Sequence, residues 1–194
     1  MSIGRSRLEE KTLSSERVFS GKIVSLRLDT VELPNGVSAT REVVETRDSV
    51  AVAPITGDGS VVMVRQYRYA GKSELLEIPA GRMEAFEDPE VAAARELSEE
   101  TGYECVSLTK IAGFYVAVGF ATEYMHLFTA EVGRVQAAHP DEDEFVETEL
   151  VPMSEIPGMI KSQKIKDVKT LAGLLYVVWT HGLASGDGQG ASGI

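Results

Sequence analysis

The chain has 194 residues, of which 43% are hydrophobic and 25% are charged, and both values are ordinary for a soluble globular protein. No apolar run is long enough to cross a bilayer, the polar N-terminal residues predict no signal peptide, and the formal charge of −11 disfavours binding to nucleic acid. Cys105 is the only cysteine, so no internal disulfide can form and we expect a cytoplasmic protein.

The first part of the chain predicts β-hairpins. Pro34-Asn35-Gly36 and Gly57-Asp58-Gly59 are turn signals, and strand-like segments lie on both sides of each of them. The predicted strands are residues 17–33, 37–46, 49–55, 60–67 and 75–79.

A change of period at Asp88 predicts a helix. Asp88 is a good N-cap, Pro89 fits the first helical position, and Gly102 is the expected C-cap. A second helix is predicted to begin near Asp167, because apolar residues then recur at helical spacing. Further strands are predicted at residues 106–114, 124–132 and 145–152, and residues 184–194 predict a disordered tail. Strands around two helices favour a mixed α/β (α+β) sandwich.

A spaced motif lies between Gly81 and Tyr103. Its nine specified positions are Gly81, Glu87, Arg95, Glu96, Leu97, Glu99, Glu100, Gly102 and Tyr103. On a helix, Glu96, Glu99 and Glu100 share one face, where their like charges repel one another. Mg²⁺ or Mn²⁺ bound to these oxygens would relieve the repulsion, and Arg95 could hold a carboxylate by a bidentate pair. For three glutamates alone, a solvated helix face would be the better interpretation.

All nine positions match the Nudix box, and the segment resembles that family in full. The resemblance implies a Nudix α/β/α sandwich with a mixed central sheet. It implies that Glu96, Glu99 and Glu100 bind metal together with the carbonyl of Ala80, and that Glu87 supports the metal cluster. Glu99 and Arg95 are then expected to act in catalysis.

Residues 64–68 and 77–81 resemble the ADP-ribose pyrophosphatase branch of the family. In that branch an arginine at the position of Arg68 contacts the diphosphate, which a guanidinium fork can bind at two oxygens. Arg65 and Arg68 could instead cap a strand end or pair with surface glutamates. We expect the phosphate role for Arg68 and a structural role for Arg65.

Residues 113–123 resemble a substrate loop of the same branch, with one departure. Val118 stands where that branch often has a proline, so the loop could accept another sugar or several substrates. Glu123 is an additional candidate for substrate binding.

The acidic run at residues 141–144 resembles a loop that supplies a general base in this branch. Glu144 matches best and Glu142 second, and a solvated charge run is the equally weighted alternative. A base on a mobile loop could position water once substrate is bound.

The function implied is Mg²⁺-dependent hydrolysis of ADP-ribose, or of a related nucleoside diphosphate sugar, to AMP and ribose 5-phosphate. The alternatives are a hydrolase of another nucleotide sugar, such as a GDP-sugar, and a non-catalytic module that senses nucleotides. The expected organisation is an N-terminal β extension at residues 1–48, a Nudix domain at 49–183 and a tail at 184–194. The extension resembles a sheet through which such enzymes form homodimers.

Overall fold

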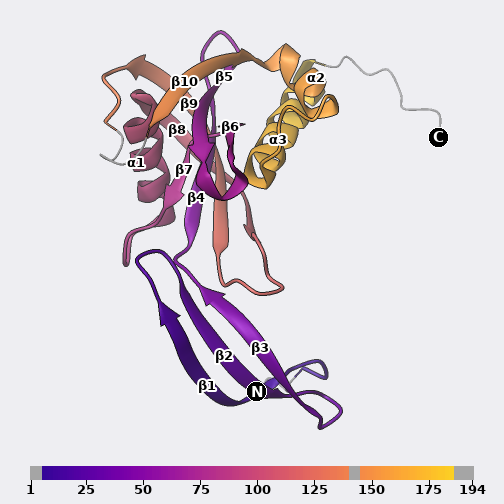
Figure 1. Ribbon diagram of the computed structural model, residues 1–194. Coiled ribbons are helices and arrows are strands. Elements are labelled where there is room, and N and C mark those ends of the chain that lie inside the picture. Colours follow the sequence, from indigo (N-terminus) through magenta and orange to yellow (C-terminus); the bar gives the residue numbers. More distant parts are fainter. Residues whose placement is uncertain (1–5, 140–144, 186–194) are drawn as a thin grey trace, which may run out of the picture. The chain divides into compact units, whose positions relative to one another are not determined.

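The computed structural model describes residues 6–139 and 145–185, with side chains as far as residue 181. The chain forms two compact units (Figure 1). The first unit combines residues 1–48 with residues 115–124, and the second combines residues 49–114 with residues 125–194.

The first unit is built on an antiparallel sheet in the order β1-β2-β3, with β1 at Lys11–Ser20, β2 at Ser25–Glu32 and β3 at Ser38–Glu45. The prediction of one strand over residues 17–33 was wrong, because Gly21 begins a turn in which its N–H donates to the Val24 carbonyl at 2.9 Å. Every residue of β1 is exposed. Among the described residues of this unit, only Asp29 and Val31 are buried, so the sheet has almost no core of its own.

The second unit contains a seven-stranded sheet with the order β10-β5-β4-β9-β8, in which β6 pairs with β5 and β7 pairs with β4. β4 and β9 run parallel, whereas the pairs of β5 with β6 and with β10 are antiparallel, so the mixed sheet expected from the sequence is confirmed. The strands are β4 at Ser49–Ile55, β5 at Ser60–Arg68, β6 at Ser73–Glu77, β7 at Ala80–Arg82, β8 at Tyr103–Tyr115, β9 at Tyr124–Val135 and β10 at Val146–Pro152.

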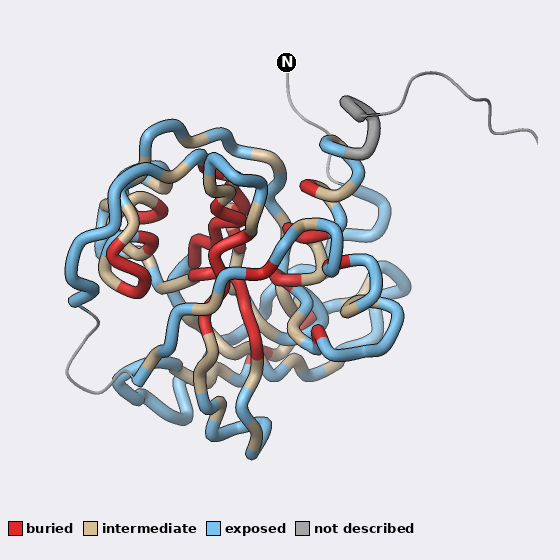
Figure 2. Tube along the Cα trace, turned by 90° about the horizontal axis from the view of Figure 1, so that it is seen from above, coloured by how far each residue is buried: buried red, intermediate tan, exposed pale blue. Residues whose placement is uncertain are grey.

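Helices cover the two faces of this sheet (Figure 1). Val50 and Val52 of β4 pack in one core cluster with Leu97 of α1 (Pro89–Thr101). Ala53, on the opposite face of β4, lies close to Gly173 of α3 (Val168–Ser185). Apart from Asp29 and Val31, all the buried described residues belong to this unit, and Figure 2 shows the buried segments in red. The sandwich architecture is therefore confirmed.

Local sequence signals explain how α1 begins and ends. The Asp88 side chain accepts a hydrogen bond from the Glu90 N–H, and Pro89 occupies the first turn. Gly102 has φ of +72°, the left-handed conformation that favours glycine, and its N–H donates to the Ser98 carbonyl. Both predicted ends of this helix are confirmed.

Three features differ from the prediction. The three-residue strand β7 and the short helix α2 (Ile156–Lys161) were not predicted. Helix α3 extends to Ser185, so the first two residues of the expected tail are helical, while residues 186–194 lie outside the described residues. Among the described helices, none combines the length and the apolar character needed to span a membrane.

Candidate active site

Arg95 joins three glutamates of the motif. Its Nε and one terminal nitrogen donate to the two carboxylate oxygens of Glu87 at 2.9 and 3.0 Å. Its other terminal nitrogen donates to Glu96 at 2.8 Å and to Glu99 at 2.9 Å. We call these four side chains the Arg95 cluster. Arg95 and Glu99 are four residues apart on α1, so they lie on neighbouring turns of the same helix face. The loop before the helix places Glu87 beside Arg95.

The Arg95 cluster lies against Gly81 of strand β7. The buried Glu100 accepts a hydrogen bond from the Ala80 N–H at 3.1 Å, so the backbone of β7 and the helix are tied together. A Cβ atom on Gly81 would lie 2.0 Å from Cδ of Glu96, which means that the Glu96 carboxylate occupies the space above this glycine. The motif therefore requires glycine here because a carboxylate fills the place of a side chain.

The carboxylates of the motif suit a hard divalent cation in their chemistry. Glu87, Glu96 and Glu99 face the single guanidinium of Arg95, so negative charge is in excess there, and oxygen donors are what Mg²⁺ and Mn²⁺ prefer. In the part of the chain that the structure describes, no three acidic, histidine or cysteine side chains converge in a ready-made ligand set. Arg95 also binds Glu96 and Glu99, two of the expected metal ligands, so a bound cation would share these carboxylates with that guanidinium.

The ion pairs change the protonation equilibria of the cluster. The hydrogen bonds from Arg95 hold the pKa of Glu87 below its ordinary value. The same bonds, first to Glu87 and then to Glu96, raise the pKa of Arg95 well above its ordinary value. The guanidinium is therefore a permanent charge that keeps Glu87 ionised.

A second group of charges lies beside β5, β6 and the start of α3. The Arg68 guanidinium makes a two-pronged pair with Glu77, at 2.9 and 2.6 Å. Lys169 donates to the same Glu77 oxygen as Arg68 at 2.6 Å, and to Asp167 at 2.8 Å. We call Arg68, Glu77, Asp167 and Lys169 the Glu77 network. Sequence reasoning missed Glu77, Asp167 and Lys169 as partners of Arg68, because Lys169 lies 92 residues beyond Glu77 and no local pattern signals the contact.

Burial and charge oppose each other at Glu77. Burial pushes the pKa of this carboxyl up, but Arg68 and Lys169 outweigh burial and hold the pKa below its ordinary value. Glu77 raises the pKa of Arg68, with smaller contributions from Glu100 and Asp167, so the network is electrostatically coupled to the glutamate that binds Ala80. The Arg68 side chain is still 39% exposed, although it is paired with Glu77.

The remaining predicted residues are dispersed. Arg65 pairs with Glu149 at 2.6 Å, as the structural interpretation of this arginine requires. Glu123 belongs to the first unit, where its carbonyl accepts a hydrogen bond from the Val116 N–H. Glu142 and Glu144 lie outside the described residues.

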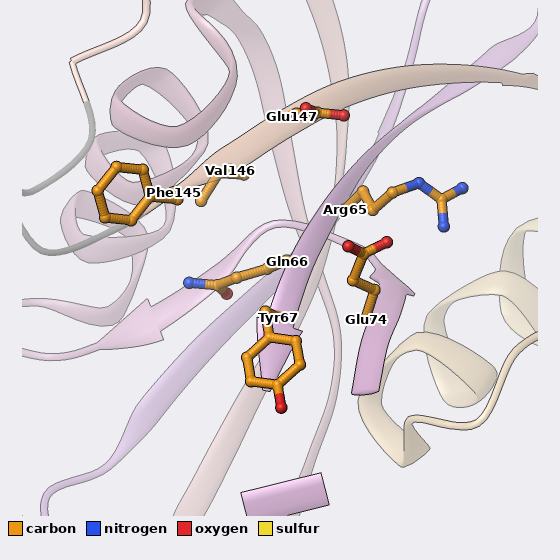
Figure 3. Close-up of a pocket in the computed structure, with 7 residues that line it drawn as sticks. All are labelled: Arg65, Gln66, Tyr67, Glu74, Phe145, Val146 and Glu147. Atoms are coloured by element: carbon orange, nitrogen blue, oxygen red, sulfur yellow. The ribbon is translucent and has the colours of Figure 1, made fainter. Parts of the chain in front are cut away.

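A cavity of about 400 Å³ lies along β5, with walls from β6 and the beginning of β10 (Figure 3). Its lining residues are Arg65, Gln66, Tyr67, Glu74, Phe145, Val146 and Glu147. Figure 3 shows Gln66 on one side of β5, and Arg65 with Glu74 on the other. No residue of the Nudix-like motif lines this cavity.

Comparisons with known proteins agree with the motif. A family model described as "NUDIX domain" matches residues 45–173, and one described as "Nucleoside diphosphate sugar hydrolase N-terminal domain" matches residues 10–44. An ADP-ribose pyrophosphatase of Bacillus subtilis (strain 168) is 44% identical, covering 88% of this chain and 93% of its own length. A methanol dehydrogenase activator of Bacillus methanolicus is also 44% identical, with 87% and 92% covered.

More distant relatives also match this chain over nearly its whole length. A GDP-mannose pyrophosphatase of Shigella flexneri is 30% identical, over 89% of this chain and 97% of the relative. A crystal structure of an ADP compounds hydrolase superposes with a TM-score of 0.82 at 23% identity, covering 92% of this chain and 98% of that one, which shows a shared fold. Because the family model spans more than half of the chain and the relatives match over nearly its whole length, the chain belongs to the Nudix hydrolase family.

Proposed function

We propose that this protein hydrolyses the diphosphate bond of ADP-ribose, or of a related nucleoside diphosphate sugar, with Mg²⁺ or Mn²⁺ as cofactor. The observation that carries the proposal is the excess of carboxylates at the Arg95 cluster and Glu100, packed against Ala80 and Gly81 of strand β7. The name of the Bacillus subtilis relative supports ADP-ribose as the first substrate to test. The expected products are AMP and ribose 5-phosphate.

Each residue has a stated task in this proposal. Glu96, Glu99, Glu100 and the Ala80 carbonyl would hold the cation, and Arg95 keeps Glu96 and Glu99 in place through its hydrogen bonds. The bound cation supplies neutralisation of diphosphate charge and a lowered pKa for water. The exposed part of Arg68 binds diphosphate oxygens, and Glu123 is proposed to contact the substrate.

Glu144 is proposed as the general base that takes the proton from the attacking water, with Glu142 as the second candidate. Glu144→Gln removes the basic group and keeps the size of the side chain. We expect kcat to fall by about 10²-fold or more, the range for loss of a general base. If Glu142→Gln has this effect and Glu144→Gln does not, the assignment within the acidic run is reversed.

The proposed reaction is tested by chromatographic product analysis with ADP-ribose. The expected result is equal amounts of AMP and ribose 5-phosphate with Mg²⁺ or Mn²⁺, and no turnover with EDTA. The same assay with no nucleotide sugar hydrolysed under any metal would support the non-catalytic, nucleotide-sensing alternative. An intact motif opposes that alternative, because all nine specified positions are present.

A GDP-sugar is the second candidate substrate, favoured by Val118 in the loop where the resemblance expects proline. Val118 is 72% exposed and is therefore not retained for packing. We expect GDP-mannose to be hydrolysed within one or two orders of magnitude of ADP-ribose in kcat/KM, and Val118→Pro to widen the gap by stiffening the loop. A kcat/KM for ADP-ribose below that for GDP-mannose would reverse the order of the two substrates.

We also propose a cytoplasmic homodimer in which residues 1–48 supply the contact. β1 exposes Leu13, Val18 and Phe19, and this sheet has almost no core of its own. Sedimentation of the full chain should give twice the chain mass of 21.0 kDa, and Val18→Asp should shift it toward the monomer. A monomeric parent protein at micromolar concentration would contradict the proposal.

A further inference from the structure

Lys169 occupies a buried position where its charge has two acceptors. The residue is 8% exposed, and its ammonium lies 2.6 Å from Glu77 and 2.8 Å from Asp167. Burying a lysine costs free energy unless it is paired, so these two contacts explain how the charge is retained. Neither partner of Lys169 belongs to the Nudix motif, and the proposed reaction assigns no role to Lys169.

Lys169 and Arg68 bind the same carboxylate oxygen of Glu77. Both nitrogen atoms lie 2.6 Å from the same oxygen of Glu77. Glu77 is almost fully buried, so water cannot compensate its charge, and the two cations are its main partners. Without Lys169, Arg68 would be the main cation left to neutralise the charge of Glu77.

We propose that Lys169 is a positioning residue that neutralises Glu77 and so leaves the exposed part of Arg68 able to bind the diphosphate of the substrate. This inference rests on the proposed function, because it requires Arg68 to meet a diphosphate. An unshared Glu77 would compete with the substrate for the guanidinium and would add negative potential where an anion must bind. Lys169 therefore acts on substrate affinity through Glu77, without contact to the substrate.

The anchoring of α3 fixes this arrangement. The Asp167 carboxylate accepts from the Thr170 N–H at 3.0 Å and from the Thr170 hydroxyl at 2.6 Å, which caps the start of the helix. The same Thr170 hydroxyl accepts from the Ile78 N–H at 3.0 Å. The first turn of α3 is thus bound to the residue next to Glu77, so the ammonium of Lys169 is held at a defined place beside the pair.

The test uses steady-state kinetics of ADP-ribose hydrolysis at saturating Mg²⁺ with the full chain. Lys169→Met removes the charge and keeps much of the length, and Lys169→Arg keeps the charge. Lys166→Met is the matched control, because it removes the same charge from an exposed position three residues before Lys169. We expect Lys169→Met to raise KM about tenfold with a smaller change in kcat, Lys169→Arg to restore KM within about threefold, and Lys166→Met to leave it unchanged.

A double-mutant cycle separates positioning from general destabilisation. In an Arg68→Met background, Lys169→Met should change KM by less than about twofold, because its effect passes through Arg68. The inference is overturned if Lys169→Met leaves KM unchanged, if Lys169→Arg is as impaired as Lys169→Met, or if the KM effect persists in the Arg68→Met background. If Lys169→Met does not fold, Lys169→Gln takes its place in the cycle. Absence of ADP-ribose turnover in the parent chain overturns the proposed function, whereas failure of this inference shows only in the variants.

Discussion

The Arg95 cluster and the Glu77 network are both built from arginine and glutamate, yet their charge balance differs. In the Glu77 network, Arg68 and Lys169 face Glu77 and Asp167, so the charges cancel. In the Arg95 cluster a single guanidinium faces three glutamates, and Glu100 binds the Ala80 N–H of the neighbouring strand β7. A balanced network needs no further ion and loses stability when one partner is removed, while an excess of carboxylates calls for a cation from outside.

The comparison shows why an ion pair alone does not identify an active site. Each group is held by hydrogen bonds of similar length, between 2.6 and 3.0 Å. The difference lies in the charge left over after pairing. Removal of a charge should therefore lower kcat at the Arg95 cluster, whereas at the Glu77 network it should lower stability and substrate affinity.

The largest expected effect is a loss of turnover when a motif glutamate, Glu99 or Glu100, is neutralised. Glu99→Gln and Glu100→Gln should each lower kcat by at least about 100-fold at saturating Mg²⁺, because a neutral amide is a poor ligand for a hard cation. Both variants should stay folded, since neutralisation relieves repulsion between glutamates on one helix face. Near-normal turnover in both, together with unchanged circular dichroism, would remove the metal assignment from these residues.

The next effect is on stability at the balanced network. Glu77→Gln leaves Arg68 and Lys169 without their shared carboxylate, and the free energy of unfolding at neutral pH should fall by about 3 kcal/mol. Urea denaturation monitored by fluorescence measures the change. A loss smaller than that caused by Glu149→Gln at the exposed Arg65 pair would show that the network stabilises no more than a surface ion pair.

The same network predicts the direction of pH dependence. The pKa of Glu77 is lowered in the folded chain, so its stabilising contribution is present above the unfolded value of about 4.3 and is lost as the pH falls through the lower folded value. The parent should therefore lose stability below about pH 4.3, and Glu77→Gln should lose less of it over that range. Parallel stability curves for the two proteins in urea would contradict the assignment of this loss to Glu77.

A smaller effect on turnover is expected from Gly81→Ala. The added Cβ would meet the Glu96 carboxylate, which can move because it is the end of a flexible side chain. Stability should change by about 1 kcal/mol or less, but kcat should fall about tenfold because a cation ligand is displaced. Gly57→Ala is the control, since a Cβ there meets nothing within 4 Å and its backbone φ is not positive. Equal kcat values for the two variants would show that the position of Glu96 is unimportant.

The smallest expected effect is a shift of the thermal midpoint by metal. Mg²⁺ at about ten times its Kd should stabilise the chain by about 1.4 kcal/mol, which raises the midpoint by a few degrees relative to Na⁺ at matched ionic strength. Glu99→Gln should reduce the shift, and Glu77→Gln should leave it unchanged. A shift that survives Glu99→Gln but disappears in Glu77→Gln would reverse the division between the two groups.

The prediction was accurate at the ends of α1 and wrong at the Gly21 turn and at α2, for physical reasons. The ends of α1 follow from Asp88 and Gly102, whose effects on backbone geometry are local, and the structure confirms both. The turn at Gly21 was missed because the Ser20-Gly21 pair, a turn signal, lies between two strand-like segments that were read as one strand. Helix α2 was missed because Pro157 and Gly158 read as helix breakers in so short a segment.

The sequence by itself determined the identity and spacing of the motif, and with them the crowding of Glu96, Glu99 and Glu100 on one helix face, because helical periodicity is a local property. Only the tertiary structure decided what each charge meets. The contact of Glu100 with Ala80, the space that Glu96 takes above Gly81, and the sharing of Glu77 by Arg68 and Lys169 join segments that are 9 to 92 residues apart. Such contacts depend on how the sheet and helices pack, and no local pattern in the chain encodes them.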